Sequence, residues 1–201
     1  MTTSHSLKSD GKPNLFSFDI ETEIKNIDRW VFDNKRYSKR DLETEANLLK
    51  QIAVDIINVI ETKVLMDKQL DNVVNAIENG ASGVWEPATT KLEILSYHFD
   101  NAKLRLTELI KNASSQTVER VLNCVSDNFT INELTELFIF TFSSKSKKVR
   151  IKTANVSLEM RDKRLIPLLK DELNKQSDNE VKKTIQFAID NMWQPKGQLT
   201  F

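Results

Sequence analysis

Apolar residues recur every three or four positions along most of the chain, which places them on one side of an α-helix. The first stripe predicts a helix of about four turns and consists of Phe16, Ile20, Ile24, Ile27 and Val31. A second, longer helix is predicted from about Asp41 to Lys63. Neither has an equivalent later in the chain, so we interpret residues 15–63 as an N-terminal helical hairpin or cap.

Shorter helices are predicted from residue 64 onward. One spans about 67–79 and ends at Asn79-Gly80, a suitable C-terminal cap. Residues 81–86 are predicted to form the longest internal loop, and Pro87 is placed in the first turn of the next helix, which ends near Phe99. The following helix, about 102–111, is expected to bury Leu104, Leu106, Leu109 and Ile110.

Two sequences of the Ser/Thr-x-x-Glu form mark later helix starts. They are Thr130 with Glu133 and Ser177 with Glu180, and each pair predicts a capping box. Between them, three phenylalanines alternate at positions 138, 140 and 142, so a strand competes with the helix there. The preceding box favours a helix that is apolar on more than one side.

A repeat of about 32 residues organises the chain from 64 to 193. Val118, Val149 and Val181 stand 31 and 32 residues apart, and each begins a triplet of inward positions. The triplets are Val118/Leu122/Val125, Val149/Thr153/Val156 and Val181/Ile185/Ala188. Each triplet falls in the second helix of a pair, so about four pairs predict an all-α solenoid.

One stretch resembles a HEAT repeat. Asp162 precedes Leu165-Ile166-Pro167-Leu168-Leu169, and Asp178 precedes Val181-Lys182, as a proline in the first helix and an acidic residue with a Val-basic pair do in that family. Val149-Arg150 and Ala154 match the second half of the repeat before it. The resemblance implies a right-handed α–α superhelix, HEAT-like or armadillo-like, whose concave second helices bind other macromolecules.

Composition agrees with short helices joined by polar turns. The 201 residues include four glycines, with none between Val84 and Lys196, and 29% are charged. Cys124 stands alone, and we expect it to be buried and inert. Residues 1–14 are polar and are expected to form a flexible N-terminal tail, and residues 194–201 are interpreted as a C-terminal tail. No signal peptide or membrane span is predicted, and a cytoplasmic protein is the expectation.

Charge is balanced overall but unevenly placed. The net charge is zero with a pI of about 6.8, while residues 145–184 hold 12 Lys/Arg against 6 Asp/Glu. The candidate binding cations are Lys145, Lys147, Lys148, Arg150, Lys152, Lys182 and Lys183. Cations in the first turn of a helix oppose its dipole, which suggests an anionic partner, either an acidic protein face or a phosphate. A solvated charged turn would also explain them, and pairing with the acidic N-terminal half of the chain is a further alternative.

Tryptophans supply the other candidates. Trp85 lies in the predicted loop, where it either serves as an interface residue or packs against the N-terminal helices. Trp193 is expected to close the last repeat. His98 is expected to be a surface or half-buried side chain and not a catalytic base.

The residue inventory disfavours an enzyme. Two histidines and one cysteine cannot build a usual zinc site, and no phosphate loop or nucleophile elbow occurs. We therefore predict no catalytic residue, metal or cofactor. The leading hypothesis is an adaptor, assembly subunit or immunity-type inhibitor that binds a protein partner with an acidic surface. The alternative is a nucleic-acid-binding or DNA-repair protein like the HEAT-like DNA glycosylases, with Trp85, Trp193, Asp100 and Arg150 as candidates.

Overall fold

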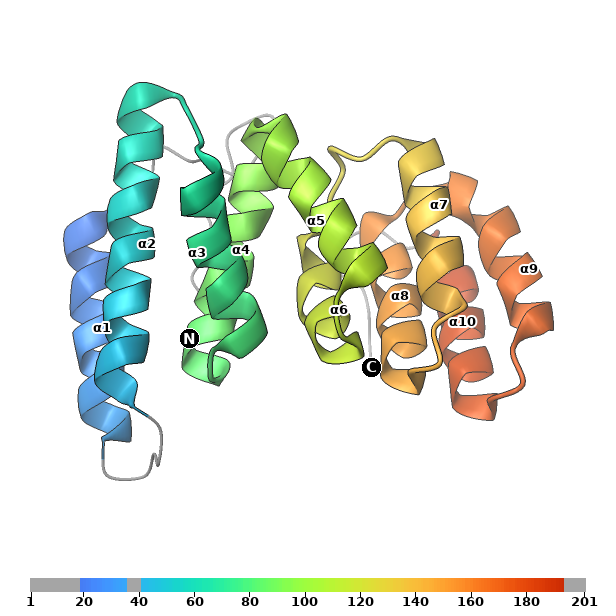
Figure 1. Ribbon diagram of the computed structural model, residues 1–201. Coiled ribbons are helices and arrows are strands. Elements are labelled where there is room, and N and C mark those ends of the chain that lie inside the picture. Colours follow the sequence, from blue (N-terminus) through green and yellow to red (C-terminus); the bar gives the residue numbers. More distant parts are fainter. Residues whose placement is uncertain (1–18, 36–40, 194–201) are drawn as a thin grey trace. The chain divides into compact units, whose positions relative to one another are not determined.

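The computed structural model describes residues 19–35 and 41–193, and all regular structure in those ranges is helical. The prediction of an all-α protein is therefore confirmed. The chain divides into two compact units, Met1–Leu106 and Thr107–Phe201, and the boundary falls inside α5 (Asp100–Asn112). Figure 1 labels the helices of both units.

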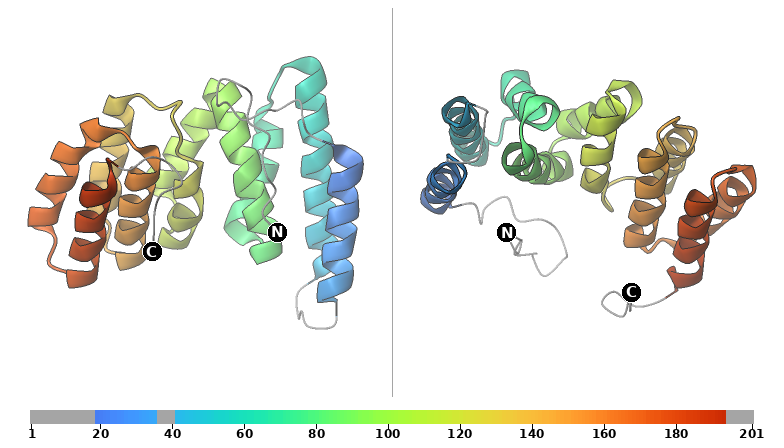
Figure 2. Two further views of the ribbon diagram at one scale, coloured as in Figure 1. Left: turned by 180° about the vertical axis from the view of Figure 1, so that it is seen from behind. Right: turned by 90° about the horizontal axis from the view of Figure 1, so that it is seen from below.

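The first unit contains two pairs of neighbouring helices. α1 (Ile20–Asn34) lies beside α2 (Leu42–Thr62), and α3 (Asp67–Asn79) lies beside α4 (Ser82–His98). α2 also contacts α3 and α4 (Figures 1 and 2). The core of this unit consists of apolar side chains that are nearly inaccessible, among them Ile52, Val59, Val73, Ile77, Leu92 and Leu95. Phe16 of the predicted first stripe lies outside the described residues.

A buried carboxylate joins α2 to α3. Asp55 is only 8% exposed and accepts hydrogen bonds of 3.0 Å from both Gln51 Nε2 and Asn72 Nδ2. The Gln69 side chain donates to the Asp55 carbonyl oxygen at 3.4 Å. Because each acceptor meets a donor, this acidic residue can occupy the apolar side of α2.

The predicted loop at 81–86 is wrong, because α4 already begins at Ser82. Pro87 therefore lies inside the helix and not in its first turn. Gly80 is extended, with φ −74° and ψ 154°, and so does not act as a left-handed cap. A Cβ there would come within 2.4 Å of the Ala76 carbonyl oxygen, so close approach of the backbone is what requires glycine.

The second unit begins within α5 and continues with α6 (Ser115–Val121), extended by the 3-10 turn η2 (Leu122–Cys124). α7 (Ile131–Phe142) pairs with α8 (Lys147–Met160). The 3-10 turn η3 (Lys163–Leu165) leads into α9 (Ile166–Lys175), which pairs with α10 (Asn179–Asn191). Helices that hold the same position in successive pairs are also in contact. The second helix α8 contacts both α6 and α10, and the first helix α7 contacts α9 (Figures 1 and 2).

The predicted inward positions of the repeat are confirmed. All nine residues of the triplets that begin at Val118, Val149 and Val181 are buried. Thr153 is the polar member, and its hydroxyl donates to the Val149 carbonyl oxygen at 2.8 Å. The hydroxyl is therefore satisfied within its own helix, and Thr153 can stand in an apolar row.

Two expectations about apolar and capping residues need correction. Leu104 is 60% exposed, so it does not share the buried side of α5 with Leu106. The cap of α10 is Asp178, not Ser177, because the Asp178 carboxylate accepts from Glu180 N at 2.9 Å and Val181 N at 3.1 Å. Residues 131–142 form a helix, so the predicted helix is confirmed there and the alternative of a strand is wrong.

Candidate functional site

The start of α8 is linked to the start of α10 by an ion pair. Lys147 Nζ lies 3.5 Å from Asp178 Oδ2 and also contacts Glu180 Oε2. The hydrogen bond that Lys147 donates to the Glu180 carboxylate is the main cause of a raised pKa at Lys147. The pKa of Asp178 is lowered, chiefly because the Val181 amide donates to its carboxylate. One predicted binding cation therefore has an internal partner.

Arg150 also has an internal role. Its Nη1 donates to the Ser144 carbonyl oxygen at 2.6 Å and to the Lys145 carbonyl oxygen at 3.2 Å. These carbonyls belong to the turn between α7 and α8, where no N–H group within a helix is available to donate to them. Arg150 thus binds two carbonyl groups of this turn and links the turn to the first part of α8.

The other predicted cations differ in exposure. Lys145, Lys148 and Lys183 are exposed, whereas Lys152 and Lys182 are half-buried. Within the described ranges, no ion pair involves any of these five lysines. They therefore remain available to an external partner.

Helical spacing places two of these lysines on one side of α8, and the repeat register places a third on the corresponding side of the neighbouring α10. Lys148, Lys152 and Asn155 recur at intervals of four and three along α8, and Lys183 and Phe187 are four apart on α10. We call the following set the α8–α10 face: Lys148, Ile151, Lys152, Asn155, Lys183 and Phe187. In the 32-residue register Lys183 is equivalent to Ile151, and Phe187 is equivalent to Asn155.

The face is basic with an aromatic ring in it. Phe187 is 38% exposed, and Ile151 is half-buried. Glu180 is equivalent to Lys148 but is paired with Lys147, so its charge is offset, and the exposed Glu159 bounds the row on α8. By the helical period, Lys182 lies on a different side of α10 from Phe187. Phe187 was not selected from the sequence as a candidate binding residue. Its position outside the buried triplet of α10 could have indicated that its ring is exposed.

Trp85 does not join this face. It belongs to α4 of the first unit and is half-buried within a helix, so its predicted loop position is wrong. Trp193 is 63% exposed, and Lys163 Nζ lies 4.1 Å from its ring centroid. Met192, not Trp193, is the buried residue at the end of the last pair, with 2% exposure.

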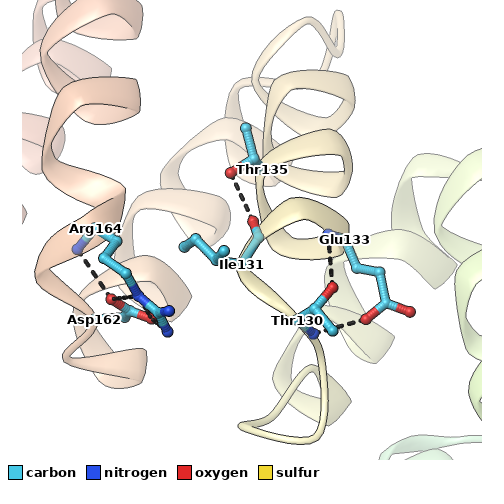
Figure 3. Close-up of polar contacts among 6 residues, drawn as sticks. All are labelled: Thr130, Ile131, Glu133, Thr135, Asp162 and Arg164. Carbon is cyan, nitrogen blue, oxygen red and sulfur yellow. Dashed lines mark hydrogen bonds and ion pairs between the residues drawn. The ribbon is translucent and has the colours of Figure 1, made fainter.

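The starts of α7 and of the 3-10 turn η3 are fixed by local polar contacts (Figure 3). Thr130 and Glu133 form the predicted capping box, with Glu133 Oε2 accepting from Thr130 N at 2.7 Å. Arg164 Nη2 lies 2.6 Å from Asp162 Oδ2, and this hydrogen bond is the main cause of a lowered pKa at Asp162. Arg164 is thus already paired and adds nothing to the α8–α10 face.

Other chemistry is sparse in the described part of the chain. Cys124 is buried, and no cluster of His, Cys, Asp and Glu among those residues could hold a metal ion. None of the helices described is long and apolar enough to cross a membrane. Comparisons with protein-family models, curated proteins and solved structures found no match to this chain.

Proposed function

We propose that this chain is a non-enzymatic helical-repeat protein that binds a protein partner through the α8–α10 face. The partner would present an acidic surface, and the chain would act as an adaptor, assembly subunit or immunity-type inhibitor. The carrying observation is that Lys148, Lys152 and Lys183 share the α8–α10 face with the exposed Phe187 and the half-buried Ile151, and that these lysines form no ion pair within the described residues.

The helix pairs support a HEAT-like or armadillo-like assignment. α3–α4, α7–α8 and α9–α10 are contacting pairs of similar length, and α5 and α6 occupy the matching place in the chain. Pro167 is the second residue of α9, close to where the family places its proline. Asp178 caps α10 directly before Val181. Repeats of this kind wind into a right-handed superhelix and expose their second helices to partners.

A basic face that includes an exposed aromatic side chain suits a protein interface. Aromatic residues are enriched at energetic hot spots, and charges around them steer association and select the partner. A duplex-DNA binder would more usually carry a strong positive charge, whereas this chain has a formal net charge of zero. Arg150, a candidate for DNA contact, is occupied by backbone carbonyls.

The test is affinity capture with a charge-reversed variant. Wild type and a Lys148→Glu, Lys152→Glu, Lys183→Glu variant are used side by side to capture partners from nuclease-treated lysate of the source cells. We expect a stoichiometric protein partner with wild type and at least about a tenfold loss with the variant. Arg150 is left unchanged, because its reversal would break the turn before α8.

A matched control carries the same charge change elsewhere. Lys68, Lys111 and Lys170 are exposed and lie off the α8–α10 face, so their reversal should leave capture intact. Equal loss in both variants would contradict recognition by this face. Salt-sensitive binding to duplex DNA that is lost only in the first variant would instead support the nucleic-acid alternative.

A further inference from the structure

A cavity of about 320 Å³ opens in the first unit among α1, α2 and α4. Its walls include the Trp30 indole, Leu49 and Pro87, and two carboxylate residues, Glu23 and Glu86, also line it. This volume lies at the lower end of the range for small-molecule sites. The lining is thus aromatic and apolar with acidic groups.

On one wall of the cavity, Gly83 of α4 leaves room for the Trp30 indole of α1. A Cβ on Gly83 would lie 1.9 Å from Trp30 Nε1, so only glycine permits this contact. Four residues later, Pro87 has no N–H, and the Gly83 carbonyl oxygen therefore lacks its usual helical donor. The same residue thus makes room for the ring and has a carbonyl oxygen without its usual helical donor.

The acidic groups give the cavity a negative balance. Glu23 Oε1 lies 2.9 Å from Lys91 Nζ, and this largely buried pair links α1 to α4. Glu86 is exposed and forms no ion pair with any described residue. One carboxylate is therefore neutralised internally, while the other can attract a cation.

We propose that this cavity binds a small organic cation of the alkylammonium class. Indole is the strongest aromatic partner for a cation, and alkylammonium groups combine positive charge with apolar surface. Leu49 and Pro87 would contact the alkyl groups, Glu86 would balance the charge, and the Gly83 carbonyl could accept from an N–H or O–H of the ligand. An anion would meet two carboxylates and gain nothing comparable.

Choline and its neutral isostere 3,3-dimethylbutan-1-ol test the role of charge. Both are titrated calorimetrically into the full chain at constant ionic strength. We expect saturable binding of choline and at least about tenfold weaker binding of the isostere. Equal affinity for the two compounds, or no saturable binding of choline, would overturn the proposal.

Variants then place the site. Trp30→Leu should weaken choline binding about tenfold, with circular dichroism confirming that the helices persist. Glu86→Lys changes an exposed residue and keeps the test valid if Trp30→Leu unfolds; it should abolish choline binding and spare that of the isostere. Glu61→Lys, an equal charge change on exposed α2 surface off the cavity, should leave both unchanged. Unaltered choline affinity in Glu86→Lys would exclude this cavity as the site.

Discussion

Asp178 illustrates how a single side chain can serve a helix and its neighbour at once. Its carboxylate accepts two backbone amides of α10 and lies within ion-pair distance of Lys147 on α8. An anion at the start of a helix also interacts favourably with the helix dipole. The hydrogen bonds from the Val181 and Glu180 amides and the contact with Lys147 all favour the ionised form, and they explain why the pKa of Asp178 lies below its ordinary value.

Asp178→Asn should therefore change how stability depends on pH. A carboxylate whose pKa is lowered on folding stabilises the protein above its unfolded pKa, about 3.9, and this contribution disappears as pH falls through the folded value. Asparagine retains capping ability without the charge. We expect wild type to be the more stable at pH 7 and the difference to shrink as the pH falls below the unfolded pKa. Urea denaturation at pH 3, 5 and 7 measures it, and a difference independent of pH would contradict the assignment.

The helix α4 shows where sequence reasoning reached its limit. Gly80, Gly83 and Pro87 are residues typical of turns, and together they predicted a loop over 81–86. In the structure Gly80 allows close approach to Ala76, and Gly83 makes room for Trp30 from another helix. The contact partner of Gly83 lies more than fifty residues away, so no local pattern could reveal it.

Helices with a regular apolar stripe were predictable for the converse reason. The repeat triplets depend only on local spacing, and their burial follows from hydrophobic periodicity. The candidate site was only partly predictable, because the sequence could not show that Lys147 pairs with Asp178 or that Arg150 meets backbone carbonyls. Lys63 and Arg161 end α2 and α8 in the left-handed conformation. Neither is a glycine, so the sequence could not predict this conformation.

Gly83→Ala tests the seating of Trp30 against α4. Alanine favours a helix by up to about 1 kcal/mol over glycine, but the added Cβ meets the indole, and overpacking costs about 1–3 kcal/mol. We expect net destabilisation in wild type and net stabilisation when Trp30 is already replaced by leucine. The four urea unfolding curves of this double-mutant cycle give the coupling. Additive effects on the free energy of unfolding would mean that there is no steric interaction between residue 83 and Trp30.

At the scale of the whole molecule, each unit has its own core. Helices α2 to α4 contact one another through apolar residues of the first unit, and α6 to α10 do so in the second. We expect one unit to be able to open while the other remains folded, as cooperative sub-domains do in hydrogen exchange.

Val149→Asp should separate the two units in such an experiment. Val149 is 1% exposed on α8, and an unpaired charge buried there should cost about 3–5 kcal/mol. Because α8 contacts α6, α7 and α10, amides of these helices should lose protection together, whereas those of α2, α3 and α4 should keep it. Asn155→Asp places the same residue at an exposed position of α8 and should leave protection nearly unchanged. Equal loss in α2 to α4 would show that the units unfold as one, and unchanged protection in α8 would refute the repeat register.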